Sequence, residues 1–187
     1  MTDRDRWNAK FVAGEAQLSE PDPLLLEACS DLPPGNALDL AGGAGRHAIW
    51  LAQHGWRVLL TDVSDEGLAL AAQRSAEAAV ALTFRRESVE ETLAWATKYQ
   101  DVYDLRFDLI TVFLFLAREH FSALPLLLAP GGRLIYKTCT SEHRRFQERH
   151  SLAYALHPGE LGKAFPALET ILYREADGIA ELVAKRS

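Results

Sequence analysis

Three glycines and the acidic residue before them carry the clearest chemical signal in this chain. Residues 39–46 read Asp-Leu-Ala-Gly-Gly-Ala-Gly-Arg, and the residues that follow have apolar side chains at helical spacing. Glycines let a backbone approach a ligand closely, and the first N–H groups of a following helix are open to a polar ligand. Such a turn at the carboxyl end of a parallel strand is where open α/β sheets bind nucleotides. The stretch therefore predicts a nucleotide-type ligand.

Acidic residues at the ends of three successive predicted strands narrow the choice of ligand. They are Asp39, Asp62 and Glu87. A carboxylate beside the glycines would repel a pyrophosphate, but it suits a ligand that carries an ammonium group. S-adenosylmethionine has an amino group and a sulfonium and no phosphate. By itself, the loose GxGxxG/A pattern at 43–48 fits a nicotinamide cofactor equally well.

Strand and helix patterns alternate along the chain and place these acids at one edge of a sheet. Strands are expected at 37–41, 58–61, 82–86, 107–113 and 133–138, and two more at 170–174 and 179–184. Helices are expected at 23–29, 46–54, 64–79, 89–98 and 121–128, with a turn at 130–132. Alternation at this pitch predicts an α/β fold with a mostly parallel seven-stranded sheet and helices on both faces.

Length and composition limit the function classes. The 187 residues predict a single domain over 1–187, with 1–35 as an N-terminal helical lid and 36–187 as the core. The net charge of -6 argues against nucleic acid as a partner. The apolar stretch 109–117 is too short for a membrane helix, which needs about 20 residues. Two distant cysteines predict neither a disulfide framework nor a metal site, and with a charged start they favour a cytoplasmic protein. Whether copies of the chain associate is left open.

Three motifs make the sequence resemble the class I S-adenosylmethionine-dependent methyltransferases. Residues 39–45 resemble the first motif of that family, 58–64 the second, and 128–134 the turn before the fifth strand. Together with 7–11 and 45–47, the pattern is most similar to a small branch of tellurite-resistance and thiol methyltransferase-like proteins. The resemblance implies a Rossmann-like class I methyltransferase fold, S-adenosyl-L-methionine as cofactor, and in-line methyl transfer to a small-molecule acceptor.

The same resemblance implies a set of cofactor-binding residues. Asp39 and the glycine backbone would hold the methionine part, Asp62 the ribose, and Glu87 the adenine amino group. The full set is Asp39, Ala41, Gly42, Gly43, Gly45, Arg46, Asp62, Val63, Glu87, Ser88 and Phe113. Ala41 stands where the family usually has its first glycine, so we expect its backbone to avoid positive φ. Glu87 replaces the more common aspartate.

The acceptor side has weaker signals, and no catalytic base is predicted. Trp7 and Phe11 could close over the site, His120 follows the fourth strand, and His157 lies in a loop-to-helix turn. Residues 143–150 could form a basic rim for an anionic acceptor. Each of these has an ordinary structural alternative, such as an exposed charged helix face. Two rival functions stay open: a non-catalytic methyltransferase-like binding domain and a nicotinamide-dependent oxidoreductase.

Overall fold

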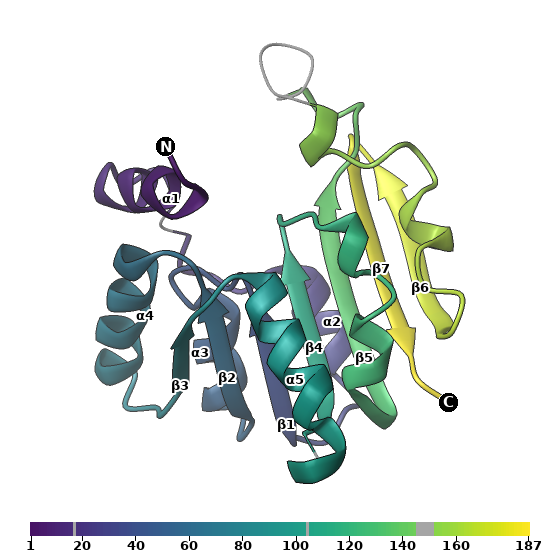
Figure 1. Cartoon of the computed structure of the whole chain (residues 1–187), viewed down its shortest axis with the longest axis horizontal. Helices are drawn as coiled ribbons and strands as arrows, with labels where there is room; N and C mark the ends of the chain where they lie inside the picture. Colours follow the sequence, from purple (N-terminus) through teal and green to yellow (C-terminus); the bar gives the residue numbers. More distant parts are fainter. Residues whose placement is uncertain (17, 104, 145–151) are drawn as a thin grey trace.

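A seven-stranded sheet forms the centre of the protein (Figure 1), and the computed structural model describes residues 1–16, 18–103, 105–144 and 152–187. The strand order is β3-β2-β1-β4-β5-β7-β6. The strands are β1 (Asn36–Leu40), β2 (Arg57–Asp62), β3 (Thr83–Arg86), β4 (Phe107–Phe113), β5 (Leu128–Cys139), β6 (Glu169–Ala176) and β7 (Ile179–Lys185). Strands β1 to β5 pair in parallel, and β7 runs antiparallel to β5 and β6. The predicted mostly parallel sheet is confirmed.

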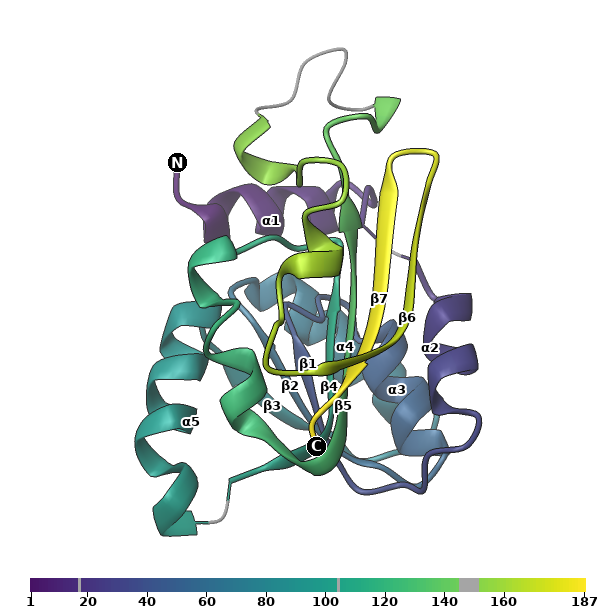
Figure 2. The ribbon, with the colours of Figure 1, turned by 90° about the vertical axis from the view of Figure 1, so that its right-hand side faces the viewer.

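Helices cover both faces of the sheet (Figure 2). One face carries α2 (Pro23–Cys29), α3 (Arg46–Gln53) and α4 (Asp65–Glu77), and the other carries α5 (Val89–Tyr103) with the 3₁₀ helices η1 (Arg118–His120) and η2 (Leu124–Leu127). Each face has its own cluster of buried apolar side chains. None of the helices in the described ranges combines the length and apolar character needed to cross a membrane.

Two expectations about the segment between β4 and β5 are wrong. The helix expected at 121–128 is replaced by the short helices η1 and η2, because Pro125 has no N–H to donate and lies in the first turn of η2. The turn expected at 130–132 falls within the bounds of β5, as an irregularity where the register with β4 shifts between Phe107 and Leu109. The connection is therefore shorter and tighter than a helix would allow.

The N-terminal ends of α3 and α4 meet the carboxyl ends of the strands that precede them. Gly45 caps α3 with a φ of 75°, and Ser64 caps α4 by accepting the N–H of Gly67 at 3.0 Å. Asp65 and Glu66 in the first turn of α4 complement the positive end of the helix dipole. A further helix, α1 (Asp3–Val12), lies across this edge of the sheet (Figure 2).

Two of the four described non-glycine residues with positive φ lie at the same edge. Ala41 has a φ of 53°, so the expectation that it avoids positive φ is wrong. Leu114, just after β4, has a φ of 56°, and its N–H donates to the carbonyl of Lys137 at 2.7 Å. The left-handed region costs a residue with a side chain about 1–2 kcal/mol. Ala41 stays there because the next residue, Gly42, donates its N–H to the carbonyl of Thr61 at 3.2 Å and ties the loop to β2.

Ala41→Gly should raise the free energy of unfolding by about 1 kcal/mol, because glycine adopts positive φ without a Cβ clash. A matched substitution, Ala72→Gly at an exposed position of α4, should lower it by about 1 kcal/mol. Urea unfolding followed by circular dichroism measures both changes. Equal destabilisation by the two substitutions would contradict the assignment of strain to Ala41.

Candidate active site

A cavity of about 520 Å³ lies at the carboxyl ends of the strands, beneath α1. Most of the residues predicted to bind cofactor or acceptor line it: Trp7, Phe11, Asp39, Ala41, Gly42, Gly43, Arg46, Asp62, Val63, Glu87, Ser88 and Phe113. Its volume lies within the range of ordinary small-molecule sites. A wider hollow of about 1000 Å³ lies at the opposite end of the strands and includes none of these predicted residues among its described lining. We therefore place the candidate site in the smaller cavity.

The glycine loop leaves space where side chains would otherwise stand. A Cβ atom on Gly42 would lie 2.5 Å from Oδ2 of Asp39, and one on Gly43 would lie 3.0 Å from Cζ of Phe11. Gly45 does not line the cavity; a Cβ there would lie 3.0 Å from Cβ of Ala71, so this glycine lets α3 pack closely on α4. The first two glycines shape the site, and the third shapes the helix contact.

Asp39 is a buried carboxylate, and the described residues provide a hydrogen bond to one of its two oxygens. Its side chain is only 1% exposed. Oδ1 accepts a hydrogen bond from Oγ1 of Thr111 at 2.7 Å, whereas Oδ2 has no hydrogen-bond partner among the described residues. Burial raises the pKa of Asp39 to about 6, against the lowering effect of the Thr111 hydrogen bond. A buried acceptor without a partner is costly, so this oxygen favours a ligand that brings a donor or a positive charge.

Asp62 holds the loop as well as lining the cavity. Its Oδ2 accepts the N–H of Gly43 at 2.9 Å, and its Oδ1 accepts the N–H of Ser64 at 2.8 Å. Burial raises the pKa of Asp62, and the hydrogen bonds from Ser64 and Gly43 act in the opposite direction. The N–H of Gly43 is thus already used within the protein, although the loop pattern alone suggested an open donor.

The next acid, Glu87, is also engaged by protein groups. Nε1 of Trp95 donates to Oε2 at 2.6 Å, and Nε of Arg85 donates to Oε1 at 2.8 Å. Ser88 begins α5, where its Oγ accepts the N–H of Glu91 at 3.1 Å. A direct contact of Glu87 with adenine stays a prediction, because both of its oxygens already have partners.

His47 is a residue of the cavity to which sequence reasoning gave no role. It lies in the first turn of α3, is 3% exposed, and stacks on Phe113 with ring centroids 3.9 Å apart. Burial, with further contributions from Arg46 and Lys137, lowers the pKa of His47 to about 3, so the imidazole is neutral at pH 7. Its Nε2 has no hydrogen-bond partner in the described part of the chain. The sequence feature that could have pointed to His47 is its position directly after Arg46, at the start of the helix that follows the glycine loop.

Helix α1 docks on the start of α4 and brings two aromatic residues to the cavity. Phe11 is 6% exposed. Oδ1 of Asn8 accepts the hydroxyl of Ser64 at 2.7 Å, and Arg4 pairs with Asp65 at 2.6 Å. Nζ of Lys10 lies 4.5 Å from the centroid of the Trp7 ring. These contacts hold α1 above the loop.

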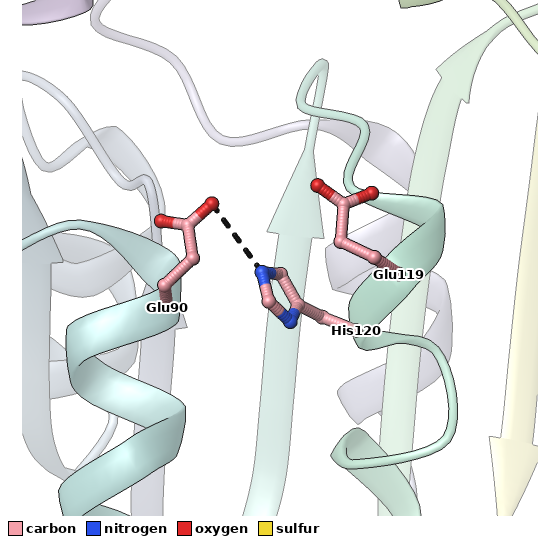
Figure 3. Close-up of side chains that lie close together, drawn as sticks. All are labelled: Glu90, Glu119 and His120. Atoms are coloured by element: carbon pink, nitrogen blue, oxygen red, sulfur yellow. Dashed lines mark ion pairs between the residues drawn. The ribbon is translucent and has the colours of Figure 1, made fainter.

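Of the acceptor candidates, Trp7 and Phe11 line the cavity, whereas His120 and His157 are not among its described lining. His120 is on η1, with Nε2 3.3 Å from Oε1 of Glu90, and Glu90 does line the cavity (Figure 3). The N–H of His157 donates to Oε2 of Glu160, which in turn pairs with Arg118. Residues 145–150 of the predicted basic rim lie outside the described residues. The structure therefore brings His120 near the site only through Glu90.

Comparisons with known proteins agree with this geometry. Residues 37–132 match a family model described as a methyltransferase domain. The curated ribosomal RNA small subunit methyltransferase C of Alcanivorax borkumensis is 36% identical over 67 residues, 34% of this chain and 21% of that protein. The chain thus spans about a fifth of the length of this relative.

Solved structures share the fold at low sequence identity. TehB from Haemophilus influenzae has a TM-score of 0.74 and 15% identity, over 95% of this chain and 66% of that one. The N-methyltransferase NodS from Bradyrhizobium japonicum WM9, in complex with S-adenosylhomocysteine, has a TM-score of 0.68 and 18% identity, over 96% and 98%. The predicted class I methyltransferase fold is confirmed.

The family match spans β1 to the first part of β5. It includes the glycine loop and the acids at the ends of β1, β2 and β3, which are the parts of the chain that build the cavity. From its sequence and its fold, this chain belongs to the methyltransferase domain family.

Proposed function

We propose that this chain transfers a methyl group from S-adenosylmethionine to a small-molecule acceptor. The observation that carries the proposal is Oδ2 of Asp39, a buried carboxylate oxygen that has no hydrogen-bond partner in the described ranges and belongs to a residue lining the cavity that Gly42 and Gly43 keep open. An ammonium group suits this oxygen, and a pyrophosphate does not. This charge argument also speaks against a nicotinamide cofactor.

The lining residues divide along the strand ends. Asp39, Arg46 and His47 would hold the methionine part. Asp62 would hold the ribose. The residues that would contact the adenine or flank the cofactor are Val63, Glu87, Ser88 and Phe113. When bound, the cofactor supplies a methyl group on a positively charged sulfur, which is the activated group of the reaction.

The protein's contribution to methyl transfer would be alignment and exclusion of water. Positioning of two reactants can lower a barrier by about 7–11 kcal/mol. We assign the roof of the site to α1, because Phe11 packs on the glycine loop and Asn8 hydrogen-bonds to the cap of α4. Residues 1–35 would then act as the lid of one domain. A cytoplasmic location is also proposed, supported by the free, buried thiol of Cys29.

Calorimetric titration with S-adenosylhomocysteine tests the cofactor. We expect micromolar binding, no binding of reduced nicotinamide cofactor, and a loss of about tenfold or more in Asp39→Asn, because a charged hydrogen bond contributes about 1.5–3 kcal/mol. Asp101→Asn, whose side chain is 80% exposed, serves as the control. Absence of S-adenosylhomocysteine binding by the folded wild type would refute the proposed function.

The affinity for S-adenosylhomocysteine should depend on the pKa of Asp39, which is about 6. Because this pKa is raised, the ionised carboxylate that binds an ammonium group predominates above pH 6 and is lost below it. Affinity should therefore fall about tenfold from pH 7 to pH 5, with release of a proton on binding near pH 6. Asp62 also has a raised pKa, so Asp39→Asn is needed to isolate the share of Asp39. A pH profile unchanged by that substitution would count against its role.

His47→Phe tests the end of the site assigned to the methionine part. Phenylalanine keeps an aromatic ring against Phe113 but removes Nε2, so we expect weaker binding of S-adenosylhomocysteine by about tenfold. Binding of 5′-methylthioadenosine should stay within about twofold of wild type. This ligand lacks the amino acid part, so it has no group there that would lose a hydrogen bond to Nε2 of His47. Equal losses for both ligands would place His47 elsewhere.

A further inference from the structure

The cavity has more carboxylates than cationic side chains. In the described ranges, the acidic residues of its lining are Asp3, Glu15, Asp39, Asp62, Glu87 and Glu90, and the cationic ones are Lys10 and Arg46. Three of the acids are assigned to the cofactor and Asp3 pairs with Arg6 at 2.9 Å, which leaves Glu15 and Glu90 beside Lys10 for the rest of the space. Clefts lined by one sign of charge concentrate ligands of the opposite sign. This lining favours a cation over an anion.

Two buried polar atoms identify this space as a ligand site. Oδ2 of Asp39 and Nε2 of His47 belong to side chains that are 1% and 3% exposed, and neither atom has a hydrogen-bond partner among the described residues. Buried polar groups in native proteins are ordinarily paired. A gap left by imperfect packing would not be lined by two such atoms.

The ring of Trp7 already holds an ammonium group. Nζ of Lys10 lies 4.5 Å from its centroid, and both residues line the cavity. Aromatic faces attract cations within about 6 Å, and indole does so best. Leu18, Leu114 and Phe115 add apolar surface to the same lining. Lys10 therefore covers the Trp7 ring, and the rest of this wall offers apolar surface to the body of a ligand.

Glu90 places a carboxylate in the lining of the cavity, next to the imidazole of His120 (Figure 3). Oε1 of Glu90 lies 3.3 Å from Nε2 of His120, and Glu119 precedes His120 on η1. The pKa of Glu90 is lowered, first by a hydrogen bond with Ser88, so the side chain is charged at neutral pH. This charged carboxylate attracts a cation, and a neutral imidazole beside it can take up a proton.

We propose that the methyl acceptor is an amine on an apolar body, bound as its ammonium ion by Glu90, with the apolar body against the surface that Leu114 and Phe115 provide. This inference rests on the proposed function. One ammonium proton passes through the Glu90 carboxylate to Nε2 of a neutral His120 imidazole, which becomes an imidazolium ion. The freed nitrogen lone pair forms the N–CH₃ bond while the C–S bond breaks and its electron pair returns to sulfur. The products are a methylated ammonium ion and a neutral thioether.

Binding to the S-adenosylhomocysteine complex tests the acceptor class. Tryptamine, tryptophol and indole-3-acetate share one ring system and differ in charge, as do benzylamine, benzyl alcohol and benzoate. In EDTA, we expect the amine of each series to bind about tenfold more tightly than its neutral and anionic analogues, by the attraction of opposite charges in a cleft. Glu90→Gln should remove this preference, and Glu169→Gln, at an exposed position of β6, should keep it.

Three results of this titration would overturn the proposal: preference for the carboxylates, no binding of either amine, or amine binding that requires an added divalent cation. The last is included because Glu90, Glu119 and His120 each place one potential ligand atom within 4.8 Å of the others. A protein that fails to bind S-adenosylhomocysteine fails the proposed function instead, so the two failures are distinguishable.

Turnover separates binding from proton transfer. In wild type, labelled methyl groups should appear on an amine of the panel, and His120→Gln should lower kcat by about tenfold or more with amine binding within about twofold. Raising the pH should restore the variant, because more amine then arrives unprotonated. Methylation of a matched thiol alone, no transfer to any amine, or an unchanged kcat in His120→Gln would contradict the proposed step.

Discussion

The carboxylate of Asp62 accepts the N–H of Gly43 at 2.9 Å and that of Ser64 at 2.8 Å, and the rest of the binding edge depends on this pair of hydrogen bonds. It joins the glycine loop after β1 to the cap of α4 after β2. With Gly42 bonded to the carbonyl of Thr61, the loop is held at two of its three glycines. The positive φ of Ala41 follows from this attachment, since the chain must turn sharply between β1 and the bonded glycines.

Once the loop is held in this way, the charges beneath it have few partners. Asp39 lies under Gly42 and accepts a hydrogen bond from the hydroxyl of Thr111. Burial, with a smaller effect of the nearby cations Arg46 and Lys137, lowers the pKa of His47 and keeps its imidazole neutral. Lys137 is itself paired with Asp22 at 2.9 Å and with Glu181 at 2.7 Å. The site therefore combines an unsatisfied carboxylate with a neutral imidazole. Both are groups whose burial is costly without a ligand.

Helix α1 links the loop to the outer part of the cavity. Phe11 rests against Gly43 and Gly67, so one ring contacts both the loop and the first turn of α4. The same helix presents Trp7 and Lys10 to the cavity, and Arg6 lies over the ring of Tyr154 at 5.3 Å. A movement of α1 would therefore alter the loop contact and the acceptor wall together.

Much of the fold and part of the site are predictable from local patterns in the sequence. Alternating apolar strands and helices specify the mostly parallel sheet, because a helix between two strands returns the chain to the same edge. Ser64 followed by two acids specifies the start of α4, and the strand–glycine–helix pattern at 39–46 specifies where the loop lies. These are interactions between residues close in sequence, which is why the order of residues is enough to find them.

Other features were decided by the tertiary structure alone. Ala41 adopts positive φ because Gly42 is bonded to the neighbouring strand, and the N–H of Gly43 is taken by a carboxylate at the end of that strand. His47 stacks on Phe113, and Glu90 meets His120, because β1 lies beside β4 and α5 lies beside η1. The sequence by itself determined the class of fold, the family resemblance and the approximate place of the site. Strand order and register decided which distant side chains meet there, since partners far apart in sequence leave no local pattern.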